Sequence, residues 1–365
     1  MLVAVLAVGV TTGVFLALSL LLLVAEKYMA NYGPCTISVN EGEVVFELQG
    51  GPTLLSALYD NKVFIPSACG GKGSCGHCKA VVLSGGGPIL PTETPFMTRT
   101  EVRSRVRLAC QVKVKENVEI RLPEDLLNVK EYKGRISLMK ELTYDIKEVN
   151  IELIEPAEIS QRPGQYVQIL AQGPDGPVFR AYSISSPTYA KDRVQLIVRL
   201  VPGGIASTYI HNLKEGDEVT FTGPYGEFKL IEDPDTDIIC VGGGAGMAPM
   251  ANIIYSIYDR WPERSCHLYF GCRGTRDVFY LDEFKALSEK HPNFKVFYAL
   301  SDPLTDEESW SGDAGFIHLS VDKRIENVHK RRQAFMCGPP PMIDAVTEVL
   351  KTKGIKDEDI FYDKF

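Results

Sequence analysis

Four cysteines constrain this chain more than any other feature of its sequence. Cys69, Cys75 and Cys78 lie in one glycine-rich loop, and Cys110 follows 32 positions after Cys78. The spacing C-x5-C-x2-C…C is one residue longer in its first gap than the plant-type spacing of [2Fe–2S] proteins. Two irons bridged by two sulfides need four thiolates, and a glycine-rich loop can point its N–H groups at the sulfurs. The spacing therefore predicts a [2Fe–2S] cluster held by these four cysteines.

Two other metal sites fit the same residues less well. A zinc site made of four cysteines usually has two well-separated C-x2-C pairs, and this chain has only one. A Rieske cluster needs two histidine ligands, whereas the loop contains only His77. The other five of the nine cysteines are scattered, which favours a redox site in a reducing compartment over a disulfide framework.

The first 25 residues differ in character from the rest of the chain. Residues 1–25 contain no charged side chain, and about 20 apolar residues are enough to cross a bilayer as a helix. We therefore predict a single-pass transmembrane anchor over residues 1–25. A cleaved signal peptide and a buried core helix are the alternatives. Because Lys27 follows the segment and no basic residue precedes it, we expect an inner (plasma) membrane protein whose soluble domains face the cytoplasm.

Three globular domains are predicted after this segment, giving a multidomain chain. Residues 33–124 contain two strand patterns, a short helical pattern and the cysteine loop, which indicates a β-grasp, ferredoxin-like α+β domain. Residues 130–232 contain short alternating apolar runs with turn signals, typical of an antiparallel β-barrel. Residues 233–365 alternate strands with helices, which predicts a doubly wound parallel α/β sheet. The formal net charge of −8 argues against nucleic acid as a partner.

Two stretches of the barrel segment indicate a flavin site. Arg180 and Tyr182 are two residues apart, so on a strand they face the same side and can reach one ligand. The arginine fork suits a pyrophosphate, and the tyrosine ring can pack on an isoalloxazine. Gly204 and Ser207 offer N–H groups and a hydroxyl near a helix start, which is a natural phosphate site. Taken alone, the short motif also fits a strand with an exposed arginine.

The third domain opens with a strand, a glycine turn and a helix. A buried-type strand at residues 236–241 leads into Gly242-Gly-Gly-Ala-Gly-Met-Ala-Pro249, and a helical pattern follows. The glycines allow close approach to a dinucleotide pyrophosphate, and the helix N-terminus favours its charge. The pattern is G-x-G-x-G-x-x-P, which departs from the standard G-x-G-x-x-G. A later strand ends in Cys337-Gly-Pro-Pro340, at the sheet edge where such folds bind ligands, although a buried structural cysteine is the alternative.

In this order the segments resemble the ferredoxin-NAD(P) reductases fused to a plant-type ferredoxin, and within them the F subunits of the sodium-translocating NADH:quinone oxidoreductases. The resemblance covers nearly the entire chain. It is carried by the N-terminal span and by Ser67-Ala-Cys-Gly-Gly, Ser84-Gly-Gly-Gly-Pro-Ile-Leu-Pro-Thr-Glu93, Arg107-Leu-Ala-Cys-Gln-Val112, Gly223-Pro-Tyr-Gly-Glu-Phe228, Gly242–Pro249 and Cys337-Gly-Pro-Pro340.

The resemblance implies an enzyme, a membrane-anchored NADH dehydrogenase module that uses FAD and passes single electrons to its [2Fe–2S] cluster. Its implied partners are NADH, the membrane and other subunits of a quinone reductase complex that also carries out ion transport. The residues implied to contact FAD are Arg180, Tyr182, Ser183, Gly204 and Ser207. Those implied to form the NADH loop are Gly242, Gly244, Gly246 and Pro249. Cys337 and Gly338 are expected near the nicotinamide and Phe365 over the flavin ring, so Cys337 and Phe365 are the expected catalytic residues.

Two departures from the family pattern leave alternatives open. No acidic residue is evident at the strand end where the standard fingerprint binds the ribose, and Arg273 and Arg276 could accept a 2′-phosphate, but the family favours NADH over NADPH. The long insertion that those F subunits carry between the segments of Tyr166 and Arg180 is replaced by a short turn, as in reductase components of bacterial oxygenases. An oxygenase reductase is therefore one alternative, and a non-enzymatic iron–sulfur electron adaptor is another.

Overall fold

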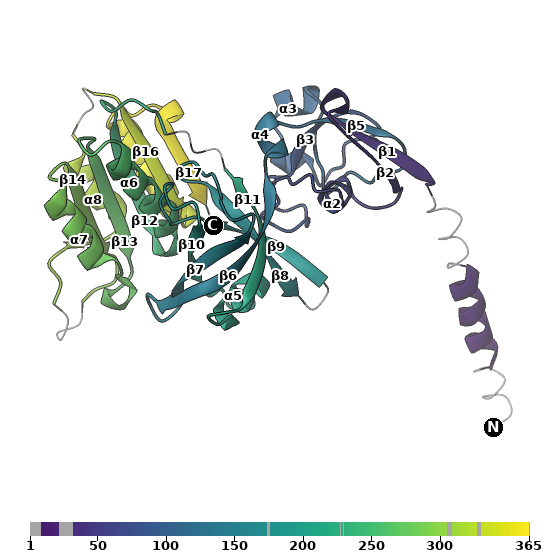
Figure 1. Cartoon of the computed structure of the whole chain (residues 1–365), viewed down its shortest axis with the longest axis horizontal. Helices are drawn as coiled ribbons and strands as arrows, with labels where there is room; N and C mark the ends of the chain where they lie inside the picture. The colour runs from purple at the N-terminus through teal and green to yellow at the C-terminus, as the bar shows by residue number, and fades with distance from the viewer. Residues whose placement is uncertain are drawn as a thin grey trace. The chain divides into compact units, whose positions relative to one another are not determined.

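The computed structural model describes residues 9–21, 32–173, 176–226, 228, 230–304, 309–326 and 330–364 (Figure 1). The chain divides into two compact units between Val129 and Lys130. Residues 9–21 are helical, and the rest of the predicted span lies outside the described residues. No helix in the described ranges is both long and apolar enough to cross a membrane, so the predicted transmembrane helix is not confirmed.

The first unit is built on a mixed five-stranded sheet in the order β2-β1-β5-β3-β4. Its elements are β1 (Pro34–Val39), β2 (Val44–Gln49), α2 (Leu54–Asp60), β3 (Lys79–Ser84), α3 (Arg99–Arg103), β4 (Val106–Leu108), β5 (Val118–Arg121) and α4 (Glu124–Leu127). Strands β1 and β5 pair in parallel and the other pairs are antiparallel. Helix α2 buries Leu54, Ala57 and Leu58, the i, i+3, i+4 face expected of a helix on a sheet. The predicted ferredoxin-like fold is confirmed.

The second unit begins with a six-stranded antiparallel sheet in the order β10-β7-β6-β11-β8-β9. Its elements are β6 (Lys130–Glu141), β7 (Ile146–Glu155), β8 (Tyr166–Gly173), β9 (Gly176–Ser183), β10 (Arg193–Arg199), α5 (Ile205–Asn212) and β11 (Glu218–Tyr225). A bridge between Ile184 and Leu196 joins the two edges of the sheet. Because this bridge closes the sheet on itself, the predicted antiparallel barrel is confirmed.

A six-stranded parallel sheet follows, in the order β15-β14-β13-β12-β16-β17. Its elements are β12 (Asp237–Gly243), α6 (Met247–Arg260), β13 (Cys266–Cys272), α7 (Leu281–Lys290), β14 (Phe294–Leu300), β15 (Asp313–Ala314), α8 (Ile317–Arg324), β16 (Arg332–Gly338), α9 (Pro340–Thr352) and β17 (Ile360–Lys364) (Figure 1). Helices α6 and α7 pack on one face and α8 and α9 on the other. The predicted doubly wound nucleotide-binding fold is confirmed.

The barrel and the parallel sheet share one hydrophobic core. Ile146 of β7 and Ile197 of β10 are buried together with Ile254 of α6 and Phe279 of the segment before α7. Continuous apolar burial of this kind holds two folded parts in a fixed arrangement. The boundary between the barrel and the nucleotide domain is therefore a defined structural feature of the second unit.

Candidate functional site

The four cysteines expected to hold the cluster lie before β3 and directly after β4. The carbonyl of Cys78 accepts a hydrogen bond from the Ala109 amide (2.8 Å), which joins the end of the loop to the segment of Cys110. Cys78 and Cys110 are buried, whereas Cys69 and Cys75 are half-buried. The fold thus brings residues from two distant segments to one place.

The four thiols form two pairs. The thiol of Cys69 lies beside that of Cys75, and the thiol of Cys78 lies beside that of Cys110. Each iron of a [2Fe–2S] cluster takes two thiolates, so two adjacent pairs are the donor set that such a cluster requires. Across the described part of the chain, no group of three His, Cys, Asp or Glu side chains is placed to hold a single metal ion. The pairing fits the cluster, as the cysteine spacing predicts.

Backbone amides of the loop point at the sulfurs of the first pair, Cys69 and Cys75. Burial alone would raise the pKa of Cys69, but the N–H groups of Ser74 and Lys72, together with the Cys75 thiol, lower it to about 7. Burial raises the pKa of Cys75 above its ordinary value, although the His77 amide acts in the opposite direction. Amide donors of this kind stabilise thiolates and help to set the reduction potential of a bound cluster.

The two thiols of the second pair, Cys78 and Cys110, shift in pKa in opposite directions. The Cys78 thiol, the Gln111 side chain (3.6 Å from Sγ) and the Gly73 amide together lower the pKa of Cys110 to about 6. The shared hydrogen bond and burial raise the pKa of Cys78 well above its ordinary value. Cys78 and Cys110 thus influence each other's pKa in opposite directions.

Two loop glycines are required by space as well as by backbone conformation. Gly73 and Gly76 have φ of 71° and 72°, the left-handed region that other residues seldom adopt. A Cβ at Gly73 would lie 2.6 Å from Nε2 of Gln111, and a Cβ at Gly76 would lie 2.8 Å from Cβ of Phe96. A side chain at position 73 would displace the end of Gln111 from Cys110, whereas one at position 76 would meet Phe96 at its Cβ, close to the backbone.

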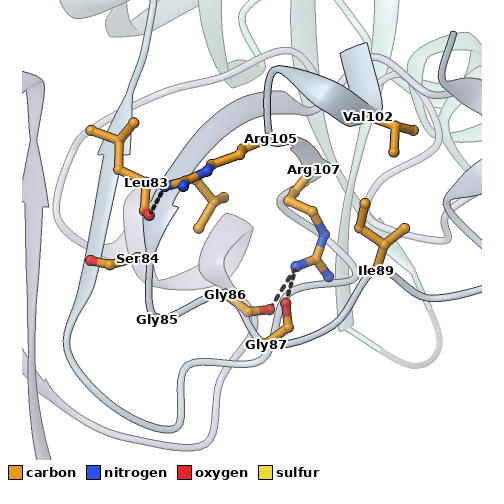
Figure 2. Close-up of a pocket in the computed structure, with 10 residues that line it drawn as sticks. Leu83, Ser84, Gly85, Gly86, Gly87, Ile89, Val102, Arg105 and Arg107 are labelled. Atoms are coloured by element: carbon orange, nitrogen blue, oxygen red, sulfur yellow. Dashed lines mark hydrogen bonds between the residues drawn. The ribbon is translucent and has the colours of Figure 1, made fainter. Parts of the chain in front are cut away.

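A buried ion pair fixes the segment that follows β3. Arg107 Nη2 lies 2.6 Å from a Glu93 carboxylate oxygen, and both side chains are at most 5% exposed. Arg107 Nη1 also donates to the carbonyls of Gly86 (2.7 Å) and Gly87 (2.9 Å), beside a cavity of about 260 Å³ (Figure 2). The Leu108 amide donates to the same carboxylate (3.0 Å). Arg107 thereby ties a glycine loop to the strand that leads to the fourth cysteine.

The predicted flavin contacts Arg180, Tyr182 and Ser183 lie on β9, and all three are half-buried. Arg180 Nη1 donates to the carbonyl of Phe179 (2.7 Å), which leaves other guanidinium donors for a ligand. Burial raises the pKa of Tyr182 to about 12, so its hydroxyl stays protonated at neutral pH. A strand that places an arginine and a protonated tyrosine on one face fits the needs of a flavin nucleotide.

The predicted phosphate contacts Gly204 and Ser207 lie at the start of α5. Gly204 is the N-cap residue, so the first N–H groups of the helix are directed outward from this end. The buried Ser207 hydroxyl accepts a hydrogen bond from the Val201 amide (3.1 Å) and also contacts the Val201 carbonyl (3.4 Å). In this structure Ser207 therefore shapes the turn before α5 rather than pointing away from the chain.

The predicted dinucleotide loop joins β12 to α6. Gly242 lies near the end of β12, Gly244 has φ of 55°, and Pro249 is buried in the first turn of α6. A Cβ at Gly246 would lie 2.0 Å from the carbonyl oxygen of Cys337, which no movement of a side chain could relieve. The loop therefore has to be glycine here, and it lies against the end of β16.

An arginine of the barrel reaches this loop. The Arg199 guanidinium would lie 3.2 Å from a Cβ at Gly244, and its Nε is 2.9 Å from the Asp145 carboxylate. Sequence reasoning missed Arg199, because nothing in its local sequence connects it to a loop of another domain. A cation held beside a glycine turn adds positive charge where a pyrophosphate is expected.

Of the two residues expected to be catalytic, Cys337 lies in the described part of the chain. Cys337 lies at the end of β16, is 2% exposed, and burial raises the pKa of its thiol well above the ordinary value, so it is neutral. Gly338 follows it, and a Cβ there would lie 2.5 Å from Cε of Met342. Phe365 lies outside the described residues.

One carboxylate side chain, that of Asp277, lies in the turn that follows β13. Asp277 is 7% exposed, and one of its oxygens accepts from the Gly274 amide (2.9 Å). Its other oxygen, Oδ1, has no hydrogen-bond partner among the described residues. Of the two arginines considered for a 2′-phosphate, Arg276 stacks on the Tyr144 ring (4.7 Å) and Arg273 is exposed. Asp277 thus lies five residues after Cys272, the last residue of β13, whereas the standard fingerprint places its acidic residue at the strand end.

Three domain families match successive parts of the chain. They are the 2Fe-2S iron-sulfur cluster binding domain over residues 35–115, the oxidoreductase FAD-binding domain over residues 133–230, and the oxidoreductase NAD-binding domain over residues 240–348. All the predicted cofactors thus have a matching domain, and the domains follow the predicted order.

Solved structures of similar fold include two reductases. The structure of the Amycolatopsis cytochrome P450 reductase GcoB superposes with a TM-score of 0.72 and 29% identity, covering 91% of this chain and 98% of that one. A ferredoxin reductase of carbazole 1,9a-dioxygenase superposes with a TM-score of 0.68 and 25% identity, with the same coverage.

Curated relatives match along almost their full length. The F subunit of the Na(+)-translocating NADH-quinone reductase of Neisseria meningitidis is 38% identical, with 97% of each chain covered. The protein of the same name in Actinobacillus succinogenes is 36% identical, with 98% of each covered. This chain belongs to the family formed by the F subunits of the Na(+)-translocating NADH-quinone reductases.

Proposed function

We propose that this chain oxidises NADH and passes electrons through FAD to its own [2Fe–2S] cluster, and from there to another component of a membrane quinone reductase complex. The observation that carries the proposal is the pairing of Cys69 with Cys75 and of Cys78 with Cys110 in a chain that also has flavin and nucleotide domains. When bound, a flavin exchanges either two electrons or one, which links a hydride donor to a one-electron centre.

The residues of the chain bind and orient rather than exchange protons. Arg180 and the N-terminus of α5 are the proposed anchors for the phosphates of FAD, since both offer positive charge and N–H donors. The glycine loop before α6 and Arg199 are proposed to hold the pyrophosphate of NADH. The neutral, buried Cys337 is proposed to shape the nicotinamide end of the site, because a protonated thiol has little nucleophilic or basic character.

The preference for NADH over NADPH is proposed to rest on Asp277. A carboxylate near the adenosine ribose accepts hydrogen bonds from hydroxyls and repels a 2′-phosphate. Asp277→Asn keeps an oxygen for the Gly274 amide and removes the charge. We expect the ratio of kcat/KM for NADH to that for NADPH to fall roughly tenfold, equivalent to about 1.4 kcal/mol. An unchanged ratio would contradict this role, and Asp282→Asn, on the exposed first turn of α7, is the control.

An anaerobic NADH titration of the purified full-length chain tests the electron path. NADH should bleach the flavin absorbance and then give the electron paramagnetic resonance signal of a reduced [2Fe–2S] cluster. A chain that carries a cluster but no flavin would refute the reductase function and support the electron-adaptor alternative. Flavin bleaching without cluster reduction would refute the second half of the path.

The membrane anchor over residues 1–25 remains part of the proposal. It is supported by the absence of charged side chains in this segment and by the family to which the chain belongs. The proposed topology has one span in the inner membrane, with the soluble domains in the cytoplasm. If the full-length chain were released from membranes by alkaline carbonate as completely as a chain lacking residues 1–25, the anchor would be excluded.

An oxygenase reductase is the second candidate. The turn between β8 and β9 is short, and the chain is similar to a cytochrome P450 reductase and to a dioxygenase reductase over 91% of its length. Affinity capture of the full-length chain from detergent-solubilised membranes separates the two functions. Membrane subunits of a quinone reductase would support the first, and an oxygenase as the sole partner would establish the second. Sodium-coupled ion transport would then be measured on the captured complex.

A further inference from the structure

Asn252 of α6 is completely buried at the boundary between the nucleotide domain and the barrel. Its side-chain oxygen accepts a hydrogen bond from the Gly164 amide (2.6 Å). Its Nδ2 donates to Oε1 of Gln161 (3.2 Å) and to the carbonyl of Ser186. Three hydrogen bonds thus run from one side chain of the nucleotide domain to two separate segments of the barrel.

These two barrel segments flank the strands that carry the proposed flavin contacts. Gly164 lies two residues before β8, and Ser186 lies three residues after the end of β9. Strands β8 and β9 pair along their whole length, with Tyr182 opposite Val167. A side chain that bonds to the flanking segments at this end of the strand pair therefore fixes the position of β9 and its side chains.

On the other side, Asn252 is rigidly connected to the nucleotide loop. It lies in α6 three residues after Pro249, or about 5 Å along the helix axis at roughly 1.5 Å per residue. One turn later Ser256 Oγ accepts from the Thr188 amide (3.2 Å), so two successive turns of α6 bond to the barrel. Displacement of α6 at Asn252 would move the glycine loop by a similar amount.

A second buried contact crosses the same boundary. The Tyr280 hydroxyl donates to the Glu148 carboxylate of β7, and Asn150 Nδ2 donates to the other oxygen (3.1 Å). This pair fixes the orientation of the two domains near α7, while Asn252 and Ser256 supply hydrogen bonds that join α6 itself to the barrel. Buried polar groups satisfied in this way specify one relative position of the packed parts.

We propose that Asn252 is a positioning residue for hydride transfer, a role that rests on the NADH-to-flavin function proposed above. It holds the helix that carries the nicotinamide dinucleotide loop at a set distance from the flavin-bearing strands. Reacting atoms must come to about 3–3.5 Å for transfer, and a misplacement of about 1 Å can cost on the order of 10²-fold in rate. The side-chain amide of Asn252 is engaged by its three bonds to the barrel, so its proposed action on the reaction is indirect.

Asn252→Asp is the most direct test. It preserves shape and the acceptor for Gly164, but replaces the donor by an oxygen that faces the oxygens of Gln161 and Ser186. The matched control is Asn293→Asp, since Asn293 Nδ2 also donates to two carbonyls, of Pro262 (2.9 Å) and Arg264 (2.6 Å), within the nucleotide domain alone. The measurement is the rate of flavin reduction by NADH in anaerobic stopped flow, with the dissociation constant of NADH taken from the concentration dependence.

We expect flavin reduction to slow about 10- to 100-fold in Asn252→Asp, with the NADH dissociation constant and the flavin content unchanged. The rate should recover partly at low pH, because a protonated carboxyl can again donate to one carbonyl oxygen. Neither effect should occur in Asn293→Asp. A wild-type rate and a flat pH profile in Asn252→Asp would overturn the inference, whereas failure of NADH to reduce the wild-type flavin would overturn the proposed function instead.

Hydrogen exchange gives a readout that needs no activity, on a second variant. In Asn252→Ala, the Gly164 amide loses its acceptor and should exchange at least about tenfold faster than in the wild type, because its hydrogen bond is lost. If Asn252→Asp fails to retain flavin, the stopped-flow comparison is made on Asn252→Ala. A wild-type exchange rate at Gly164, or wild-type flavin reduction in the alanine variant, would exclude the positioning role.

Discussion

The cluster loop and the boundary between barrel and nucleotide domain are suited to redox groups in two different ways. In the cluster loop, amides of neighbouring residues in 72–77 point at cysteine sulfurs, so one short segment supplies most of the environment. At the domain boundary, the contacts that set the geometry join distant residues, such as Asn252 and Gly164, which are 88 positions apart. The first site depends on local backbone conformation, whereas the second depends on the packing of two folded domains.

This difference indicates how each site should respond to change. A substitution in the cluster loop should affect the cluster and leave the nucleotide site intact, because the two sites lie in separate compact units. A substitution at the boundary of barrel and nucleotide domain should alter hydride transfer and leave the cluster intact.

The largest effect is expected for Cys110→Ser. It removes one of the four thiolates and should abolish the cluster, which is measured as loss of the visible absorption and of the paramagnetic signal after reduction. Flavin reduction by NADH should persist at the wild-type rate, since no contact between the barrel and the nucleotide domain is changed. Loss of flavin reduction together with the cluster would show that the two sites are not independent.

The next largest effect is expected from breaking the buried ion pair between Glu93 and Arg107. Glu93→Gln leaves the Arg107 charge uncompensated and should destabilise the first unit by about 3–5 kcal/mol, measured as urea-induced loss of cluster absorption. Glu101→Gln breaks the more exposed pair with Lys79 (2.6 Å) and should cost about 0–1 kcal/mol. Equal effects of the two variants would contradict the importance of burial here.

The Glu93–Arg107 pair also makes the stability of the first unit depend on pH, and the direction of the Glu93 pKa shift gives the sign of this dependence. Burial opposes ionisation of Glu93, but hydrogen bonds from Arg107, Leu90 and Leu108 lower its pKa below the ordinary value. The stabilisation is therefore present above the unfolded-state pKa of roughly 4.3 and is lost as the pH falls through the folded-state pKa. The stability difference between wild type and Glu93→Gln should shrink on acidification.

The smallest expected effect is a difference in alkylation between one thiol of each region, Cys69 and Cys337, measured in the chain without its cluster. Cys69 is half-buried with a pKa of about 7, so its alkylation should be half-maximal near pH 7. Cys337 is buried with a raised pKa and should stay unmodified over the same pH range until the chain unfolds. Mass spectrometry after peptide digestion measures both. Modification of Cys337 in the folded chain would show that the end of β16 is more open than described.

The sequence predicts these two regions with unequal success, for a physical reason. The cysteine spacing and the glycine loop are local patterns, and the strand expected at residues 236–241 is found as β12 at Asp237–Gly243. Asn252 and Arg199 cannot be identified from the sequence, because their contacts are with segments that only the folded chain brings near. A buried asparagine on an apolar helix has no local signal that separates a domain contact from an ordinary polar position.

The hydrogen bonds of Asn252 and the contact of Arg199 with Gly244 also bear on how such chains can be recombined. A nucleotide domain transplanted onto the barrel of another reductase would lose both contacts unless their partners came with it. The chain can instead be cut between Val129 and Lys130, where one compact unit ends and the next begins. Such a cut exchanges the first unit, which carries the cluster cysteines, and keeps the barrel together with its own nucleotide domain. This architecture can thus acquire new redox partners without rebuilding the contacts between barrel and nucleotide domain.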